Sequence, residues 1–213
     1  LTKTFILDTN VYLTDVGSLM AWGRNDIAIP TVILDEIDKH KHRQDTAGLN
    51  ARLTNRALDS LRSKGSFFKG VPLGTGKGRI FAAQYDPRYM PAGMSSEDSD
   101  NKIIATALRL KLEGREIVMV SRDINMRLKC DAFDIPVLSL IDCPGIMVGP
   151  ESEKSALVRH AARMFVVGAN IETPLMSVII RKAYGLGAQA MAGGSFKVPL
   201  FTVTWPTGEF GGM

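Results

Sequence analysis

The chain has 213 residues, of which 45% are hydrophobic and 23% charged, with a formal net charge of +4. This composition is typical of a globular protein and excludes a disordered chain, a coiled coil and a disulfide-stapled mini-protein. The sequence contains no uninterrupted apolar run long enough to span a bilayer, so we expect a cytoplasmic protein with no membrane partner. Cys130 and Cys143 form no CxxC pair and are expected to be reduced thiols.

Charge and glycine are distributed unevenly along the chain. Residues 1–131 contain 20 Lys/Arg and 16 Asp/Glu, whereas residues 132–213 contain six of each, so the basic excess lies entirely in the first part. Glycine occurs ten times in each part although the second is shorter. These shifts predict one domain over 1–131 and a separate segment over 132–213. The basic excess favours an anionic partner such as nucleic acid.

The first part alternates short apolar runs with helical patterns. Strands are expected at 5–7, 27–30 and 117–120. Helices are expected over 11–22, after Thr31, from a cap at Asp45 or Thr46 to Leu61, after Ser99 and after Asp123, with residues 65–95 as a loop or hairpin. The apolar stripe of the long helix is expected at Leu49, Leu53, Ala57, Leu58 and Leu61. This alternation predicts an α/β fold with a parallel sheet and helices on both faces.

Four acidic residues occupy positions where catalytic or metal-binding residues are expected. Asp8 and Asp123 follow apolar strands, and Glu36 and Asp100 are expected in the first turns of two helices. The carboxyl edge of a parallel sheet is where sites form in such folds, and carboxylates that converge there favour Mg²⁺ or Mn²⁺. Each acid taken alone is better explained as a helix cap, so the hypothesis depends on the set of four.

The segments that carry these acids resemble, in order, the motifs of PIN-domain nucleases. They are residues 5–11 (FILDTNV), 32–39 (VILDEIDK), 99–104 (SDNKII) and 120–125 (VSRDIN). The resemblance covers residues 3–131 and is closest to the PIN domain that precedes PhoH-like ATPase modules in some bacterial proteins. It implies a Rossmann-like sheet and a hydrolase, a metal-dependent endoribonuclease.

The same resemblance implies roles for individual residues. The catalytic and metal-binding residues would be Asp8, Glu36, Asp100 and Asp123, with Mg or Mn as the cofactor and Asn10 and Ser121 as supporting polar groups. Among neighbouring acids, Glu36 matches the family position, which leaves Asp35 and Asp38 as surface charges. Asp100 is preferred over Glu97 and Asp98 because it directly precedes the NKII run.

Basic residues near the second motif are candidates for RNA binding. They are Lys39, Lys41, Arg43 and Arg52. A solvated helix face is the simpler interpretation of such a run, and contact with RNA phosphates is the functional one.

The second part has its own pattern and resemblance. Strands are expected over 133–141, 177–180 and 201–205, a helix over 151–167, and a glycine-rich loop over 181–194. Residues 142–150 (DCPGIMVGP) and 181–188 (RKAYGLGA) resemble the carboxyltransferase subunit of biotin-dependent acyl-CoA carboxylases, which implies a partial crotonase-like α/β segment. By this resemblance, the amides of Gly149, Gly187 and Ala188 correspond to oxyanion sites, whereas packing of tight turns is the simpler interpretation.

The two resemblances meet within residues 130–132. We therefore interpret the chain as a chimera, natural or artificial, in which the second family's sequence is cut off near Gly211. Residues beyond about 142 are expected to expose apolar surface and to favour a homo-oligomer.

The resulting functional hypothesis is a Mg/Mn-dependent endoribonuclease that hydrolyses single-stranded RNA through a metal-activated water. One alternative is a fragment of an acyl-CoA carboxyltransferase, although we do not expect the truncated segment to transfer carboxyl groups or to take acyl-CoA as a partner. The other is a non-catalytic RNA-binding module, which would bind RNA with strong salt dependence and without turnover.

Overall fold

The computed structural model describes residues 2–212. They form two compact units, which are divided between Val120 and Ser121. Each unit is an α/β arrangement of mainly parallel strands with helices packed beside them, as the sequence predicted. No helix within residues 2–212 has both the length and the apolar character needed to cross a membrane. Cys130 and Cys143 are both free thiols, as expected.

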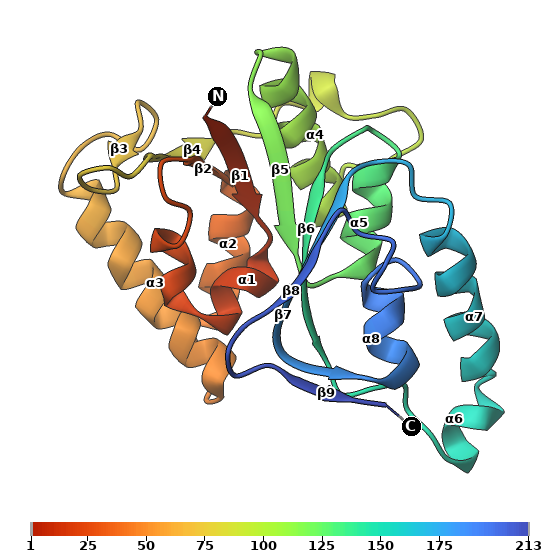
Figure 1. Ribbon diagram of the computed structural model, residues 1–213. Coiled ribbons are helices and arrows are strands. Elements are labelled where there is room, and N and C mark those ends of the chain that lie inside the picture. Colours follow the sequence, from red (N-terminus) through yellow and green to blue (C-terminus); the bar gives the residue numbers. More distant parts are fainter. Residues whose placement is uncertain (1, 213) are drawn as a thin grey trace. The chain divides into compact units, whose positions relative to one another are not determined.

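The sheet of the first unit is parallel except at one edge (Figure 1). Its strands are β1 (Lys3–Leu7), β2 (Asp26–Pro30), β3 (Val71–Pro72), β4 (Arg79–Ala83) and β5 (Glu116–Ser121), in the order β3-β4-β2-β1-β5. Only β3 runs antiparallel, to β4. Phe5 in β1 pairs with Ile27 on one side and Val118 on the other, so β1, β2 and β5 end at the same edge. Buried aliphatic side chains such as Ile6, Ile29 and Met119 form the core.

Helices connect these strands and pack against one another. They are α1 (Thr9–Thr14), α2 (Thr31–His40), α3 (Thr46–Arg62) and α4 (Ser99–Leu112), with two 3₁₀ turns, η1 (Val16–Met20) and η2 (Pro87–Tyr89). α1, α2 and α3 contact each other, and α4 contacts α2 and β2. The predicted hairpin within 65–95 is β3–β4, and β4 also joins the sheet beside β2.

Several predicted helix boundaries in this unit were wrong. The helix expected over 11–22 breaks at Asp15, whose carboxylate caps the following 3₁₀ turn. Thr31 is the first residue of α2 rather than its cap, and Asp98 rather than Ser99 caps α4. For α2 and α4, the actual cap therefore lies one residue earlier than predicted. Asp45 does cap α3, which confirms one of the two predicted caps.

The predicted apolar stripe of α3 was right at its later residues and wrong at its first. Leu58 and Leu61 are buried and Leu53 and Ala57 half-buried, as predicted, whereas Leu49 is 49% exposed. Ala51 and Thr54, which were not predicted, are also buried. At the start of the helix, Gly48 lies so close to Arg43 that a Cβ atom would be 2.1 Å from its carbonyl oxygen.

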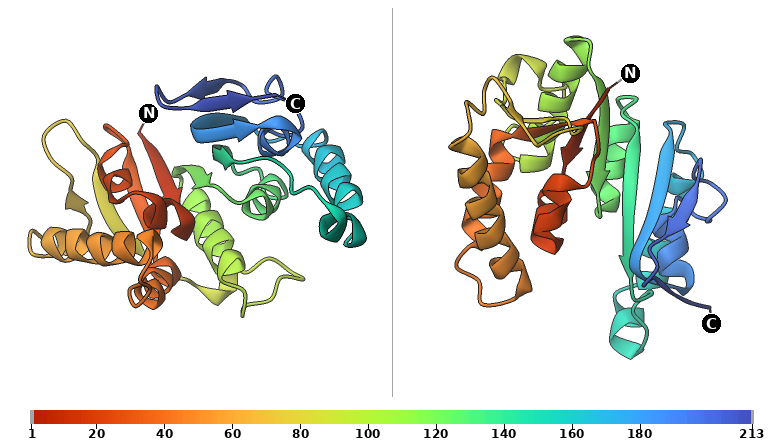
Figure 2. Two further views of the ribbon diagram at one scale, coloured as in Figure 1. Left: turned by 90° about the horizontal axis from the view of Figure 1, so that it is seen from below. Right: turned by 60° about the vertical axis from the view of Figure 1, so that its left-hand side comes forward.

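The second unit is built around one long strand (Figure 2). Its strands are β6 (Val137–Cys143), β7 (Leu175–Tyr184), β8 (Thr202–Thr204) and β9 (Glu209–Gly211), and its helices are α5 (Ile124–Asp131), α6 (Pro150–Lys154), α7 (Leu157–Gly168) and α8 (Gly185–Met191). β7 pairs in parallel with β6, β8 and β9. A core of Ile141, Ile179, Ala183, Ala188 and Ala192 lies between the strands and α8.

Three predictions for the second unit need correction. The helix expected over 151–167 is two helices, because Ala156 between them has a left-handed backbone with φ of 55°. The loop expected over 181–194 contains the end of β7 and the whole of α8. Strand β9 was not predicted, because its three residues carry no period-two pattern that can be recognised.

Polar bonds hold the start of the second unit to its later residues. The Asp131 carboxylate accepts the backbone N–H groups of Glu172 and Thr173 at 3.1 and 2.9 Å. The buried Arg127 guanidinium donates to the carbonyls of Ala190 and Met191 at the end of α8. Burial lowers the pKa of Arg127 to about 10. Residues 122–131 are thus bonded to residues 172–191 within one unit.

Exposed apolar side chains are concentrated in the second unit, as expected for residues beyond about 142. Val148, Val158 and Leu200 are each more than 70% exposed. Trp205 is 61% and Phe210 57% exposed. Self-association through these side chains stays a prediction.

Gly48→Ala is expected to destabilise the first unit by about 1–3 kcal/mol, because the new methyl group would overlap the Arg43 carbonyl. Gly65→Ala is the matched control: its Cβ would meet only the Val71 side chain, at 3.7 Å, which is ordinary contact. Thermal unfolding followed by circular dichroism measures both variants. Equal losses of stability would contradict the packing explanation.

Candidate functional site

Asp8 lies directly after β1 and caps α1. Its backbone N–H donates to the Val120 carbonyl of β5 at 2.9 Å, which continues the strand pairing by one residue. One carboxylate oxygen accepts the backbone N–H of Thr9 at 2.7 Å, and the other accepts the Asn10 side-chain amide at 2.5 Å. Asp8 is 6% exposed. The carboxylate is therefore fixed by two neighbouring groups, and its backbone by a third bond, at the edge where β1, β2 and β5 end.

Thr9 connects Asp8 to Glu36. While its backbone N–H serves Asp8, its side-chain hydroxyl donates to Oε2 of Glu36 on α2. Thr9 is buried and Glu36 is half-buried. A single residue thus holds two carboxylates from two different elements. Glu36 was predicted in the first turn of its helix, which was wrong. It is the sixth residue of α2 and lies in the second turn.

Tyr12 is a buried residue near Asp8. Its side chain is fully buried, and its hydroxyl has no hydrogen-bond partner among the described residues. Burial and then the negative charge of Asp8 raise the pKa of Tyr12 well above its ordinary value of 10.0. The phenol therefore stays neutral and places low-dielectric surface beside the carboxylate.

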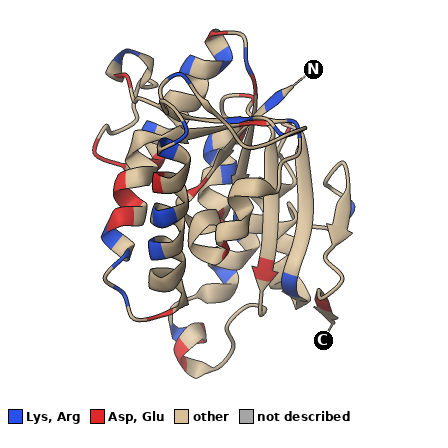
Figure 3. Ribbon diagram, turned by 90° about the vertical axis from the view of Figure 1, so that its left-hand side faces the viewer, with Lys and Arg blue, Asp and Glu red and all other residues tan. Residues whose placement is uncertain are grey.

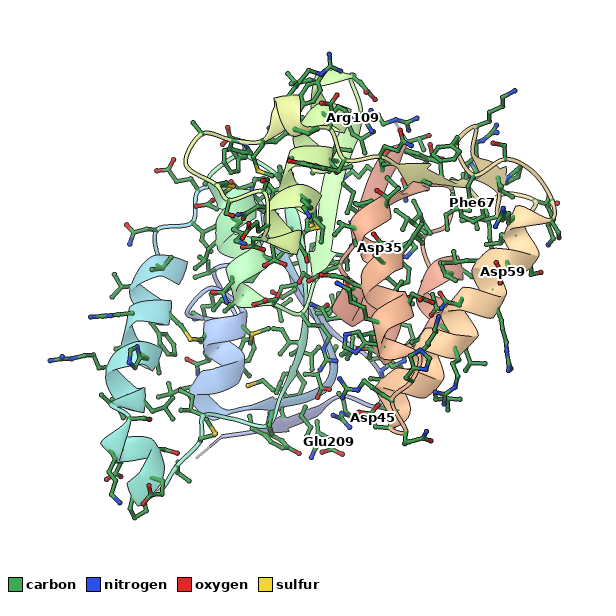
Figure 4. The ribbon with its side chains drawn as sticks, turned by 180° about the vertical axis from the view of Figure 1, so that it is seen from behind. Asp35, Asp45, Asp59, Phe67, Arg109 and Glu209 are labelled. Atoms are coloured by element: carbon green, nitrogen blue, oxygen red, sulfur yellow. The ribbon has the colours of Figure 1, made fainter. Side chains whose placement is uncertain are left out.

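Helix phase separates the neighbouring acids as the sequence predicted. Asp35 and Asp38 are exposed, whereas Glu36 is half-buried (Figure 4, where Asp35 is labelled). At the start of α4, Asp98 is exposed and accepts the backbone N–H of Asp100 at 2.9 Å as the helix cap. Asp100 lies in the first turn, half-buried. Since α4 packs against α2, Asp100 and Glu36 lie on helices in contact.

Ser121 and Asp123 belong to the second unit. Ser121 is buried, and its hydroxyl accepts the backbone N–H of Asp123 at 2.9 Å. The Asp123 carboxylate in turn accepts the backbone N–H of Asn125 at 2.8 Å and caps α5, as predicted. This local order holds both side chains at the point where β5 ends.

The donor set suits a hard cation, although the acids are not gathered into one cluster. Within residues 2–212 no group of three or more His, Cys, Asp or Glu side chains is placed to hold a metal ion. The pair that the structure does bring together, Asp8 and Glu36, offers carboxylate oxygens only. Such oxygens are the ligands that Mg²⁺ and Mn²⁺ prefer.

The candidate RNA-binding residues make mainly local contacts. Lys41 pairs with Asp38 at 2.7 Å, and Arg43 pairs with Asp45. Arg52 donates to the carbonyls of Lys41 and Arg43 at 2.7 and 2.9 Å, so it stabilises the turn between α2 and α3. Lys39 is exposed. Figure 3 shows basic and acidic positions interspersed along these helices, and contact with RNA stays a prediction.

The glycines proposed as oxyanion sites have identifiable packing roles. A Cβ at Gly187 would lie 2.8 Å from Sγ of Cys143 and 2.9 Å from the carbonyl carbon of Gly145, so glycine permits the close approach of α8. Ala188 is buried in the adjoining core, and Gly149 has a φ of 111° just before α6. The oxyanion role of these amides stays a prediction.

Asp142 is the centre of an ionic cluster that sequence reasoning missed. Its Oδ2 atom accepts hydrogen bonds from Nη2 of Arg122 at 3.0 Å and from Nη2 of Arg181 at 2.9 Å, and its side chain is 6% exposed. Burial favours the neutral acid, yet hydrogen bonds from Arg181 and the Lys182 N–H, with the charges of both arginines, hold the pKa of Asp142 below its ordinary 3.8. Thr9 was missed likewise, although it stands between two predicted site residues.

Comparisons with known proteins find similarity to two families in two parts of the chain. A family model for the PIN domain matches residues 5–141, and one for the carboxyl transferase domain matches residues 122–213. Because the first match covers more than half of its length, the chain belongs to the PIN domain family. The two matches overlap over residues 122–141, which include the predicted junction.

Individual relatives follow the same division. Protein PhoH2 of Thermobispora bispora is 39% identical over 135 residues, which are 63% of this chain and 31% of that protein. The carboxylase YngE of Bacillus subtilis is 44% identical over 84 residues, 39% of this chain and 16% of that protein. A solved structure of a single-chain, multi-domain long-chain acyl-CoA carboxylase is 58% identical over 42% of this chain and 9% of that one, with a TM-score of 0.41. The chain thus spans about a third of its PhoH2 relative.

Thr9→Val should lower the free energy of unfolding by about 1–2 kcal/mol, because the Glu36 carboxylate loses a hydroxyl donor in a half-buried position. Thr9→Ser keeps the hydroxyl and should retain most of the wild-type stability. Chemical denaturation at neutral pH measures both. A serine variant as unstable as the valine variant would indicate that packing of the Thr9 methyl group dominates.

The Asp142 cluster should stabilise the second unit only while the carboxylate is charged. Because the folded-state pKa is lowered, this stabilisation is present above pH 3.8 and is lost as the pH falls through the folded pKa. The stability difference between wild type and Asp142→Asn should therefore be largest near neutral pH and shrink below pH 3.8. Urea unfolding as a function of pH measures it, and a difference that does not depend on pH would contradict the ionic explanation.

Proposed function

We propose that the chain is a Mg- or Mn-dependent endoribonuclease that hydrolyses phosphodiester bonds of single-stranded RNA. Membership of the PIN domain family and the similarity to PhoH2 support the nuclease class. The observation that carries the proposal is the Asp8–Thr9–Glu36 arrangement, in which one residue holds two carboxylates at the carboxyl edge of the parallel sheet.

The residues proposed to hold the metal ion are Asp8, Glu36, Asp100 and Asp123. When bound, the cation would supply an activated water and neutralise charge on the phosphodiester. The chain's own contribution is positional. The backbone N–H of Thr9 and the Asn10 amide fix the orientation of Asp8, and the Thr9 hydroxyl fixes Glu36. Both Tyr12 and Asp8 are buried, so little water reaches either side chain.

Asp8→Asn and Glu36→Gln should each reduce cleavage of a single-stranded RNA by about 100-fold or more, because each removes a ligand charge but keeps the side-chain shape. Asp35→Asn is the matched control: it makes the same change in charge one position away, on the exposed face of α2. Cleavage of a fluorescent RNA is measured with added Mn²⁺ and with EDTA.

Two results would contradict the proposal. One is equal cleavage by wild type and Asp8→Asn, which would indicate a contaminating nuclease. The other is RNA binding by the wild type without any metal-dependent cleavage, which would favour the alternative of a non-catalytic RNA-binding module.

The match over residues 122–213 favours a second candidate, an acyl-CoA site related to carboxyl transferases. Calorimetry with acetyl-CoA tests it. Because the chain covers 16% of its carboxylase relative YngE, we rank this candidate below the ribonuclease.

A further inference from the structure

Beside Asp123, the second unit contains two arginines held on one buried carboxylate. Arg122 immediately precedes Asp123 and donates from Nη2 to Asp142 at 3.0 Å. Arg181 on β7 donates to the same carboxylate from Nε and Nη2, at 3.1 and 2.9 Å. Asp142 is 6% exposed, whereas Arg181 is 67% exposed. The carboxylate is therefore covered by donors, and the Arg181 guanidinium faces solvent.

An irregularity in the strand pairing creates this arrangement. Ile141 pairs with Ile179 and Cys143 pairs with Ala183, so Asp142 alone on β6 lies opposite residues 180–182 on β7. The extra residues form a bulge, and bulges re-aim side chains where regular pairing would alternate them. As a result, the Lys182 N–H also donates to Asp142, at 3.3 Å, and Arg181 turns toward the same carboxylate.

Two acidic side chains lie near Arg181. Asp142 accepts hydrogen bonds from two arginines, Arg122 and Arg181. The other nearby acid, Glu209 of β9 (labelled in Figure 4), accepts the Tyr184 hydroxyl at 2.5 Å and lies opposite Lys182 in the strand register. Arg181 bonds to Asp142 through Nε and Nη2, which leaves Nη1 for an external acceptor.

We propose that Arg181, oriented with Arg122 by Asp142, is a phosphate-binding site for the RNA backbone. The inference rests on the proposed ribonuclease function, because the arginine that is bonded with Arg181 to Asp142 directly precedes Asp123, a proposed metal ligand. A guanidinium fixed by a carboxylate has already lost most of its rotamer freedom, so less entropy is lost when it binds a phosphate. The phosphates of coenzyme A offer the same chemistry, and the experiment separates the two sources.

The test is fluorescence anisotropy of a labelled single-stranded RNA in EDTA at several salt concentrations. Loss of one single-stranded phosphate contact lowers the slope of log affinity against log salt by about 0.7, which corresponds to about fourfold weaker binding at 0.15 M salt. Arg181→Gln should show this change. Arg163→Gln makes the same change in charge on exposed α7 and should leave the slope as in wild type. Arg181→Lys keeps the charge but not the forked bond, and should retain the wild-type slope.

Several results would overturn the proposal. They are the absence of RNA binding by the wild type, equal slopes for Arg181→Gln and wild type, and equal losses for the two glutamine variants. A lower slope for Arg181→Lys would also overturn the proposal, because it would indicate that the substitution acts by distorting β7. Binding of coenzyme A that is weakened by Arg181→Gln, with RNA binding unchanged, would assign the site to the other source.

The outcome is separable from that of the ribonuclease test. If the wild type cleaves RNA and Arg181→Gln binds RNA as the wild type does, the phosphate site is refuted and the ribonuclease function stands. If Arg181→Gln binds RNA more weakly but the wild type does not cleave RNA, the ribonuclease function is refuted and the phosphate site stands.

Discussion

Parallel pairing of β1 with β2 and β5 is the constraint on which the first unit depends. Because Phe5 is in register with Ile27 and Val118, the three strands end together, and the chain must turn into a helix or loop at that edge. Asp8 is the first residue past β1 and is tied by its own N–H to Val120. Its position is therefore set by sheet geometry, and its side chain caps the start of α1.

The link from Asp8 to Glu36 brings two carboxylates together, which is unfavourable, and hydrogen bonds offset this. Two carboxylates that share a half-buried space repel each other and lose hydration. Thr9 offsets this with one backbone donor and one hydroxyl donor, and Asn10 adds an amide. The arrangement concentrates negative charge at a sheet edge in a chain whose net charge is positive, and a core chosen only for stability would avoid such a concentration.

Much of this was accessible from the sequence. Apolar runs located β1, β2, β5 and β6, because buried parallel strands are continuous in hydrophobicity. Helix phase separated Glu36 from Asp35 correctly. The exposure of Leu49 and the burial of Thr54 were not accessible, because they depend on how α3 packs against α1 and α2 rather than on a periodic pattern.

The same limit applies to the polar contacts. Thr9 carries no signal of its own, since its partner Glu36 is 27 residues away. The Asp142 cluster depends on a bulge between β6 and β7, and no local pattern marks where a register shifts. Local residue types predicted the strands and caps, whereas bonds between distant segments required the fold.

The second unit bears on how two family segments coexist in one chain. Residues 122–141 match both families, and they make long-range polar bonds within the unit: Arg127 to the end of α8, and Asp131 to the turn at Glu172. This stretch is a helix followed by a strand. The buried guanidinium of Arg127 is bonded to carbonyl acceptors rather than to an acid. These bonds tie residues 172–191 to the residues that follow Ser121 and Asp123 within the same unit.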